Sequence, residues 1–172
     1  MKKLLTRSLL FVCLLTLLSC GAVQSPPPDS ADTPQADTCE AAPVMICSNG
    51  TQIQPYANFV WAETWTEQGW LSMSGNSISR QNSGIHHLFP QAVYHEDFAL
   101  QYAGGVTPTA MAIYSEGGEL LHRNATLSDL AELAEGAYDL VITVKVQGKY
   151  IESEDRHESA GYEYACRLTV LG

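Results

Sequence analysis

Apolar and polar residues alternate along two long segments near the C-terminus. In Gly136–Val146 the apolar face carries Tyr138, Leu140, Ile142, Val144 and Val146, and the other face carries Asp139, Thr143 and Lys145. In Gly161–Leu171 the apolar face carries Tyr162, Tyr164, Cys166, Leu168 and Val170, and the other face carries Glu163, Arg167 and Thr169. A period of two with one apolar face is typical of a half-buried antiparallel strand. The pattern therefore predicts two long strands, each with one face in a core and one toward solvent.

Shorter apolar runs precede them and are separated by turn residues. Asn49-Gly50 lies between the runs 44–47 and 51–54 and predicts a hairpin, because both residues tolerate positive φ. Further strands are predicted at 59–66, 70–73, 98–102, 109–114 and 119–122. One short helix is predicted at 126–133, where Thr126 and Asp129 have the spacing of a capping box.

The segment Gly136-x-Tyr138 before the first long strand resembles the tyrosine corner of immunoglobulin-like domains, in which a tyrosine hydroxyl bonds to nearby backbone. With the many short strands, it predicts an all-β fold, an immunoglobulin-like antiparallel β-sandwich. A small β-barrel would give the same alternation and stays open as an alternative.

The N-terminus has the layout of an export signal. Lys2, Lys3 and Arg7 precede an apolar run, and that run ends in Leu17-Leu18-Ser19-Cys20-Gly21. This ending resembles the lipobox of bacterial lipoproteins. The resemblance implies a signal peptide at 1–19, cleavage before Cys20, and a diacylglycerol with acyl chains such as palmitate on the Cys20 sulfur. An uncleaved membrane anchor and an ordinary secretory signal are the alternatives.

The next segment reads as a tether. Residues 20–38 contain four prolines and three aspartates within 25–38 and no apolar periodicity, so we expect an extended, disordered link to a folded domain at 39–172. The predicted location is the extracytoplasmic face of the cell membrane, held by the lipid anchor at Cys20.

The charge balance narrows the choice of partners. The chain has 9 Lys+Arg against 19 Asp+Glu, a formal net charge of −10. Nucleic-acid binding is therefore not expected, because phosphate contacts need a basic face. A surface of this charge is repelled by anionic lipid head groups, so contact with the membrane is expected through the acyl chains. No cofactor motif is present.

Three cysteines follow Cys20: Cys39, Cys47 and Cys166. Disulfides persist outside the cytoplasm, so we expect Cys47–Cys166, which would join the first and last strands. Cys39–Cys47 and the absence of any bridge are the alternatives.

All three tryptophans, Trp61, Trp65 and Trp70, fall within ten residues. On a strand, Trp61 and Trp65 share one face, and Phe59 is expected to join them. Such a row of rings either packs in the core of the sandwich or forms an exposed face that binds a sugar or a peptide. We therefore regard Trp61, Trp65 and Trp70 as candidate ligand-binding residues, with a cell-wall glycan or a protein as the ligand.

Residues with catalytic or metal-binding chemistry form no recognised pattern. His86, His87 and His95 lie near Glu96 and Asp97, but without the spacing of a metal motif, so exposed polar residues are expected there and no metal site. The pair Glu63 and Glu67 beside Trp65 is the only arrangement that suggests glycoside hydrolysis.

Three segments carry a further resemblance: the string from Trp61 to Ser72, Val146-Gln147-Gly148-Lys149-Tyr150-Ile151-Glu152, and Gly161-Tyr162-Glu163-Tyr164. They resemble uncharacterised lipoproteins of Gram-positive bacteria. They are also similar to extracellular segments of membrane metallopeptidases of the β-lactam-sensor type. The resemblance implies an outward-facing sensing or binding module and supplies no catalytic residues. The HExxH motif of the peptidases is absent from the sequence.

The sequence thus predicts a membrane-anchored lipoprotein with a non-catalytic binding or sensing role at the cell envelope. The alternatives are an extracellular hydrolase that acts on glycans, and a sandwich-type proteinase inhibitor that presents the acidic segment 152–158 as its binding loop.

Overall fold

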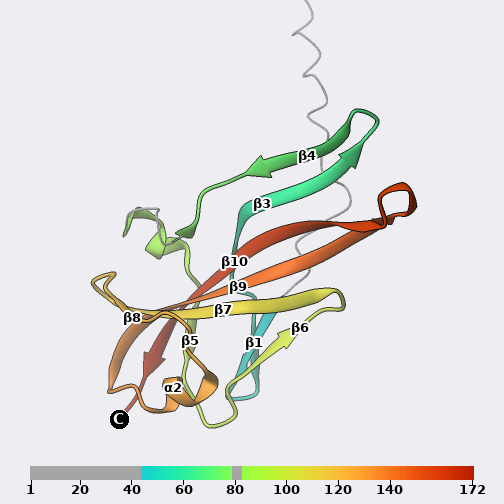
Figure 1. The fold of residues 1–172 in the computed structure, drawn as a ribbon. Helices are drawn as coiled ribbons and strands as arrows, with labels where there is room; N and C mark the ends of the chain where they lie inside the picture. Colours follow the sequence, from blue (N-terminus) through green and yellow to red (C-terminus); the bar gives the residue numbers. More distant parts are fainter. Residues whose placement is uncertain (1–43, 79–82) are drawn as a thin grey trace, which may run out of the picture. The chain divides into compact units, whose positions relative to one another are not determined.

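The two alternating segments form the longest strands of the computed structural model, which describes residues 44–78 and 83–172. Strands β9 (Gly136–Ile151) and β10 (Arg156–Val170) pair antiparallel along their whole length, from Gly136 opposite Val170 to Ile151 opposite Arg156 (Figure 1). The 3-10 turn η3 (Glu152–Glu154) connects them. Both strands extend five residues beyond the predicted strand bounds, so part of the acidic segment 152–158 is strand and not loop.

The β9–β10 pair is the centre of a seven-stranded sheet with the order β4-β3-β10-β9-β7-β8, in which β5 also pairs with β10. The remaining strands of this sheet are β3 (Tyr56–Thr66), β4 (Gly69–Ser74), β5 (Gln91–Val93), β7 (Val106–Ser115) and β8 (Leu120–His122). Strands β3 and β5 use successive parts of one edge of β10: β3 is antiparallel to residues 159–165, and β5 is parallel to residues 167–169. The sequence did not predict β5, because three residues are too few to show a period.

A smaller sheet has the order β2-β1-β6, with β1 (Val44–Ser48), β2 (Thr51–Ile53) and β6 (Ala99–Tyr102). The predicted Asn-Gly hairpin is confirmed, because Asn49 and Gly50 both have positive φ, at 50° and 67°. The Asp97 carboxylate accepts hydrogen bonds from both turn amides, at 2.7 and 3.1 Å. These backbone hydrogen bonds lower the pKa of Asp97.

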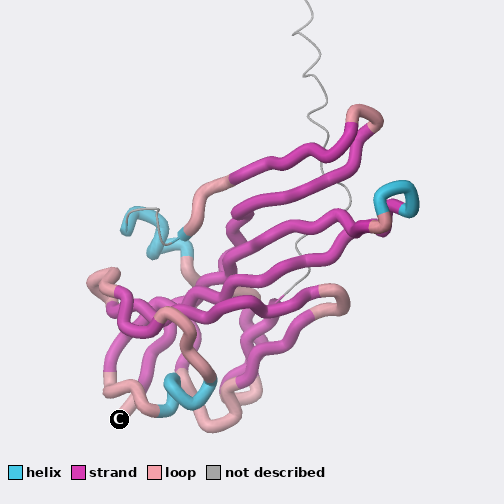
Figure 2. The backbone as a smooth tube through the Cα atoms, viewed as in Figure 1, coloured by secondary structure: helices cyan, strands magenta, loops and turns pink. Residues whose placement is uncertain are grey.

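The main core lies between the two sheets, which confirms the predicted all-β sandwich. It is made of side chains from the apolar faces of β9 and β10 together with β1, β5, β7 and the short helix: Val44, Ile46, Ala92, Phe98, Met111, Ile113, Leu130, Leu140, Ile142, Val144, Val146, Tyr164, Cys166 and Leu168. Strands make up most of the described chain, and the helical segments are short (Figure 2).

The predicted tyrosine corner is present at the start of β9. The Tyr138 hydroxyl donates a hydrogen bond of 3.0 Å to the Ala134 carbonyl. Just upstream, helix α2 (Leu127–Ala131) begins with the predicted capping box of Thr126 and Asp129 and buries Leu130 in the core. The corner therefore fixes how the chain passes from this helix into the longest pair of strands.

The second face of the large sheet is also partly covered, which corrects two predictions. Asp139 and Glu163 were expected to face solvent, but they are 1% and 7% exposed. The turn η2 (Ser83–Leu88) and residues around it cover this face, and Ile78, Phe89, Val141 and Ala165 form a second apolar cluster there. The predictions failed because a strand's own period does not show whether another segment covers its polar face.

Asp139 is buried as an ion pair. Arg167 lies directly opposite on β10 and donates from Nε at 3.0 Å, and His86 of η2 contacts the other carboxylate oxygen. The bond to Asp139 raises the pKa of Arg167. Charged groups at such a site satisfy each other, and removal of one partner would leave a buried charge unpaired.

The predicted Cys47–Cys166 disulfide is not formed, and both thiols are free. Cys166 is in the main core, whereas Cys47 lies between the buried residues Ile46 and Ser48 of β1 and faces away from the core. The alternation of β1 thus separates the two sulfurs. Cys39, the other predicted partner, lies outside the described residues, as do Cys20, the predicted signal peptide and the tether.

No helix within the described part of the chain is both long enough and apolar enough to cross a membrane.

We expect Tyr138→Phe to lower the free energy of unfolding by about 1 kcal/mol, because it removes one hydrogen bond and leaves the ring packing unchanged. Urea unfolding followed by circular dichroism would measure this. An unchanged midpoint and slope would show that the corner bond does not stabilise the fold.

We expect Cys47 to react with a thiol reagent in the native protein and Cys166 to react only after unfolding. Burial, with a smaller effect of Asp139, raises the pKa of the Cys166 thiol to about 12, and the thiolate is the reactive form. Mass spectrometry of labelled peptides would identify the modified residue. Recovery of an intact Cys47–Cys166 peptide after non-reducing digestion would contradict this arrangement.

Candidate functional site

The half of the large sheet near the β3–β4 hairpin has an exposed outer face. Across four strands, one row of directly opposed residues runs Trp61, Gly161, Lys145 and Thr107. The next row is Glu63, Ser159 and Gln147. Because opposed residues in a sheet share a face, these rows combine aromatic, small and polar side chains on one surface. We call this surface the outer face.

Trp61 lies flat over the middle of this face. A Cβ atom placed on Gly161 would come within 2.1 Å of Trp61 Nε1 and 2.6 Å of Cε2. Only glycine at position 161 leaves room for the indole, which thereby lies beside Lys145 on the neighbouring strand.

Phe59 does not share this face, contrary to prediction. The pairing of β3 with β10 shifts between Gly161 and Tyr162, so that Trp61 is opposite Gly161 but Phe59 is opposite Tyr162. Val60 is the extra residue of a β-bulge, which reverses the alternation. The Phe59 ring instead meets the edge of Tyr162, with centroids 5.9 Å apart.

Trp65 and Trp70 form the far end of the outer face. They are directly opposed on β3 and β4, with ring centroids 5.5 Å apart and planes at 62°, an edge-to-face contact. The Arg156 guanidinium lies over the Trp70 ring, 4.4 Å from its centroid, and pairs with Glu63. Arg156 thus ties the hairpin β3–β4 to the first residues of β10.

Glu158 provides a second tie at the point where the backbone ladder ends. The β3–β10 pairing stops at Glu63 opposite Ser159. Beyond it, Glu158 Oε1 accepts a hydrogen bond of 2.9 Å from the Trp65 amide, at a register shift in β10. Glu158 is 3% exposed, and its other oxygen, Oε2, has no hydrogen-bond partner among the described residues.

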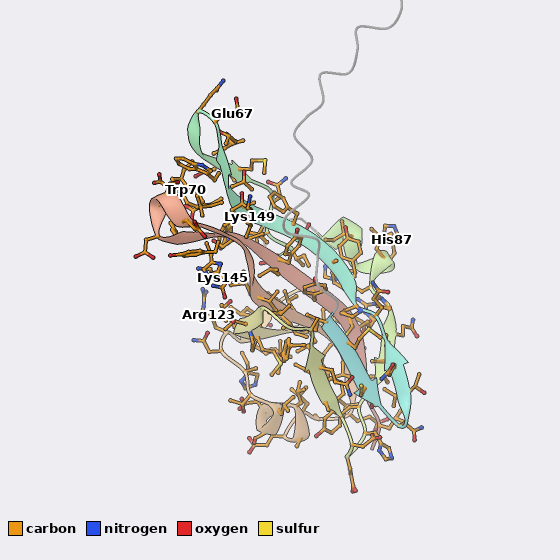
Figure 3. All side chains as sticks on the ribbon, turned by 90° about the vertical axis from the view of Figure 1, so that its right-hand side faces the viewer. Glu67, Trp70, His87, Arg123, Lys145 and Lys149 are labelled. Carbon is orange, nitrogen blue, oxygen red and sulfur yellow. The ribbon has the colours of Figure 1, made fainter. Side chains whose placement is uncertain are left out.

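A hollow of about 350 Å³ lies next to the aromatic side chains. We call it the polar pocket, and its lining residues are Thr107, Lys145, Gln147, Arg156, His157, Glu158 and Ser159. Figure 3 shows Lys145, Lys149 and Trp70 on the same side of the domain. Lys145 and Gln147 are exposed, and neither makes an ion pair or side-chain hydrogen bond with a residue in the described ranges.

The three predicted tryptophans are therefore together, but none belongs to an apolar core cluster, and each is half-buried. Sequence reasoning missed Lys145, Arg156 and Glu158 as members of the same site. Lys145 could have been found, because Lys145, Gln147 and Lys149 alternate on the polar face of β9. Nothing in the sequence indicates the register shift that turns Glu158 into the sheet.

The other candidates lie elsewhere. His86 pairs with the buried Asp139 and is not simply an exposed polar residue, and His95 contacts Asp97 at 2.9 Å. The described residues contain no group of three potential metal ligands. Glu63 is on the outer face, but Glu67 is in the exposed β3–β4 turn at the tip of the hairpin (Figure 3).

A second hollow, of about 440 Å³, opens beside α2 and is lined mainly by apolar side chains and backbone of β6, β7 and residues 124–127. It contains no charged side chain. It shares no residue with the outer face.

We expect Gly161→Ala to displace the Trp61 indole, because the new Cβ and the ring cannot occupy the same space. In a Trp65→Phe, Trp70→Phe background, the emission of Trp61 should shift to the red and iodide quenching should increase. Gly104→Ala is a matched control, since no atom lies within 4 Å of the added Cβ. Identical spectra for the two variants would show that the indole does not lie over Gly161.

Comparison with known proteins found no protein-family model, no curated protein and no solved structure that matches this chain. The geometry of the outer face is therefore the basis for a functional assignment.

Proposed function

We propose that this protein is a lipid-anchored, extracytoplasmic binding module, and that the outer face with its polar pocket is the ligand site. The observation that carries the proposal is the grouping of Trp61, Trp65 and Trp70 beside exposed hydrogen-bonding groups, outside the core. Half-buried aromatic rings supply contact area at low conformational cost, and Trp and Arg are frequent at binding hot spots.

The rings are ordered before any ligand binds. Gly161 admits the Trp61 indole, while Trp70 is held between Trp65 and Arg156. A surface that is already rigid loses little conformational entropy on binding, which favours affinity. The arrangement suits a flat ligand that stacks on indoles and hydrogen-bonds at its edge, as a saccharide does.

The lipoprotein part of the proposal is based on the lipobox-like sequence that ends at Cys20 and on the proline-rich segment after it. A tethered domain at the membrane surface would meet cell-envelope glycans at high local concentration. An anchor of this kind suits a receptor that captures or senses such a polymer.

The alternatives receive less support. Glycoside hydrolysis needs two carboxyl groups facing one bond, but Glu63 is paired with Arg156 and Glu67 lies in the hairpin turn. An inhibitor loop at 152–158 would need an extended exposed segment, but here residues 152–154 form a 3-10 turn and β10 begins at Arg156.

The test is tryptophan emission of the purified full chain in detergent, titrated with a panel of neutral and acidic oligosaccharides. We expect a saturable change with at least one member and its loss in Trp70→Ala. Leu71→Ala is the control, because Leu71 is an exposed apolar residue that follows Trp70 and lies on the opposite face of the same strand.

Equal weakening by Trp70→Ala and Leu71→Ala would contradict the assignment to this face. The absence of a saturable change across the whole panel would overturn the proposal that the face binds glycans.

A further inference from the structure

We propose that the polar pocket selects a saccharide that carries a carboxylate, with the carboxylate bound by Lys145 and a ring hydroxyl bound by Glu158. This inference rests on the proposed function and assigns the ligand class of the same site.

The first argument is an unpaired cation. Lys145 lies in the centre of the outer face, between Gly161 and Thr107, and has no acidic partner in the described ranges. Lys149 follows on the same face of β9, by the period of two. The chain has only nine Lys and Arg against nineteen acids. Because Lys145 is exposed and has no acidic partner among the described residues, it can form a charge-assisted hydrogen bond with an anionic group of a ligand.

The second argument is the unpaired carboxylate oxygen of Glu158. A buried acceptor without a donor costs free energy. Glu158 also lines the pocket, so a small rotation of its side chain would let Oε2 accept a hydrogen bond from a ligand hydroxyl and remove this cost. The same carboxylate, together with Glu63 opposite Ser159 on the outer face, would repel a ligand with a high density of negative charge. The pair Lys145 and Glu158 therefore fits a ligand with one anionic group and neighbouring hydroxyls, and disfavours phosphate polymers.

The third argument is the aromatic border of the pocket. Arg156 lines the pocket and also lies over Trp70, and the Trp61 indole lies beside Lys145. The C–H faces of a sugar ring can stack on these indoles while its edge reaches the polar side chains. An acidic peptide would satisfy Lys145 but would not place a sugar-like ring against the neighbouring Trp61 indole, so the observations favour the saccharide.

The size of the pocket sets the length of the recognised unit. About 350 Å³ is near the lower end of small-molecule sites, so the pocket takes a single sugar unit and leaves the rest of the polymer on the open sheet. The ligand we expect is therefore one acidic unit in a longer chain.

The experiment compares a tetrasaccharide that carries one glucuronate unit among three neutral sugars with its methyl ester, which has the same rings without the charge. The purified full chain in detergent is titrated by calorimetry and by tryptophan emission. We expect the free acid to bind at least about tenfold more tightly than the ester, as for one charge-assisted hydrogen bond, and the preference to fall as salt is added.

Three variants locate the effect. Lys145→Met should reduce the preference for the acid to near one. Glu158→Gln should weaken both forms, because it replaces the charged acceptor and so removes the charge-assisted hydrogen bond from the ligand hydroxyl. Arg123→Met is the matched control, since Arg123 is exposed on the same side of the domain but does not line the pocket (Figure 3). Circular dichroism confirms that each variant is folded.

The outcomes separate this inference from the proposed function. Equal binding of acid and ester, lost in Trp70→Ala, would retain the binding module and overturn the acidic specificity. An acid preference that Arg123→Met removes as much as Lys145→Met would overturn the pocket as its source. Binding of poly-glutamate with no binding of either saccharide would overturn both, and would indicate an acidic protein as partner.

Discussion

The continuous backbone pairing of β9 with β10 is the interaction on which the rest of the structure depends. Successive side chains of the two strands point to opposite faces, so this one pair of strands contributes side chains to both sides of the sheet. The apolar face holds the smaller sheet and the main core, while the other face holds the cover of η2 and, farther along, the outer face with its polar pocket. The pair is long enough for one sheet to carry both a covered region and an exposed one. One end is covered on both faces, whereas the other end leaves the outer face exposed.

Charged side chains at the two ends of this pair have different surroundings. Near the corner at Tyr138, Asp139 is removed from water and must be paired, and Arg167 and His86 supply that pairing. Farther along β9, toward the turn that joins it to β10, Lys145 remains exposed and needs no partner within the chain. A structural ion pair and an available cation thus lie on the same face of the same strand. The covering segment is what distinguishes them.

Irregularities in the ladders shape the candidate site. The shift at Gly161 directs Trp61 and Phe59 to opposite faces, and the shift at Glu158 turns a carboxylate in to meet the Trp65 amide. Bulges commonly redirect side chains near functional surfaces. Here they bring an indole, a buried acid and a free lysine together on adjacent strands, which a regular sheet of this sequence would not do.

Local signals in the sequence determined the elements: the period of two gave β9 and β10, Asn49-Gly50 gave the first hairpin, and Thr126 with Asp129 gave the helix cap. These succeeded because their physical causes lie within a few residues of chain. Tertiary structure alone decided what depends on segments distant in sequence. It buried Asp139 and Glu163 beneath another segment. It also placed Cys166 in the main core and Cys47 on the side of β1 that faces away from the core. It also placed Lys145, Arg156 and Glu158 beside the tryptophans, because strand pairing and its bulges set which side chains become neighbours.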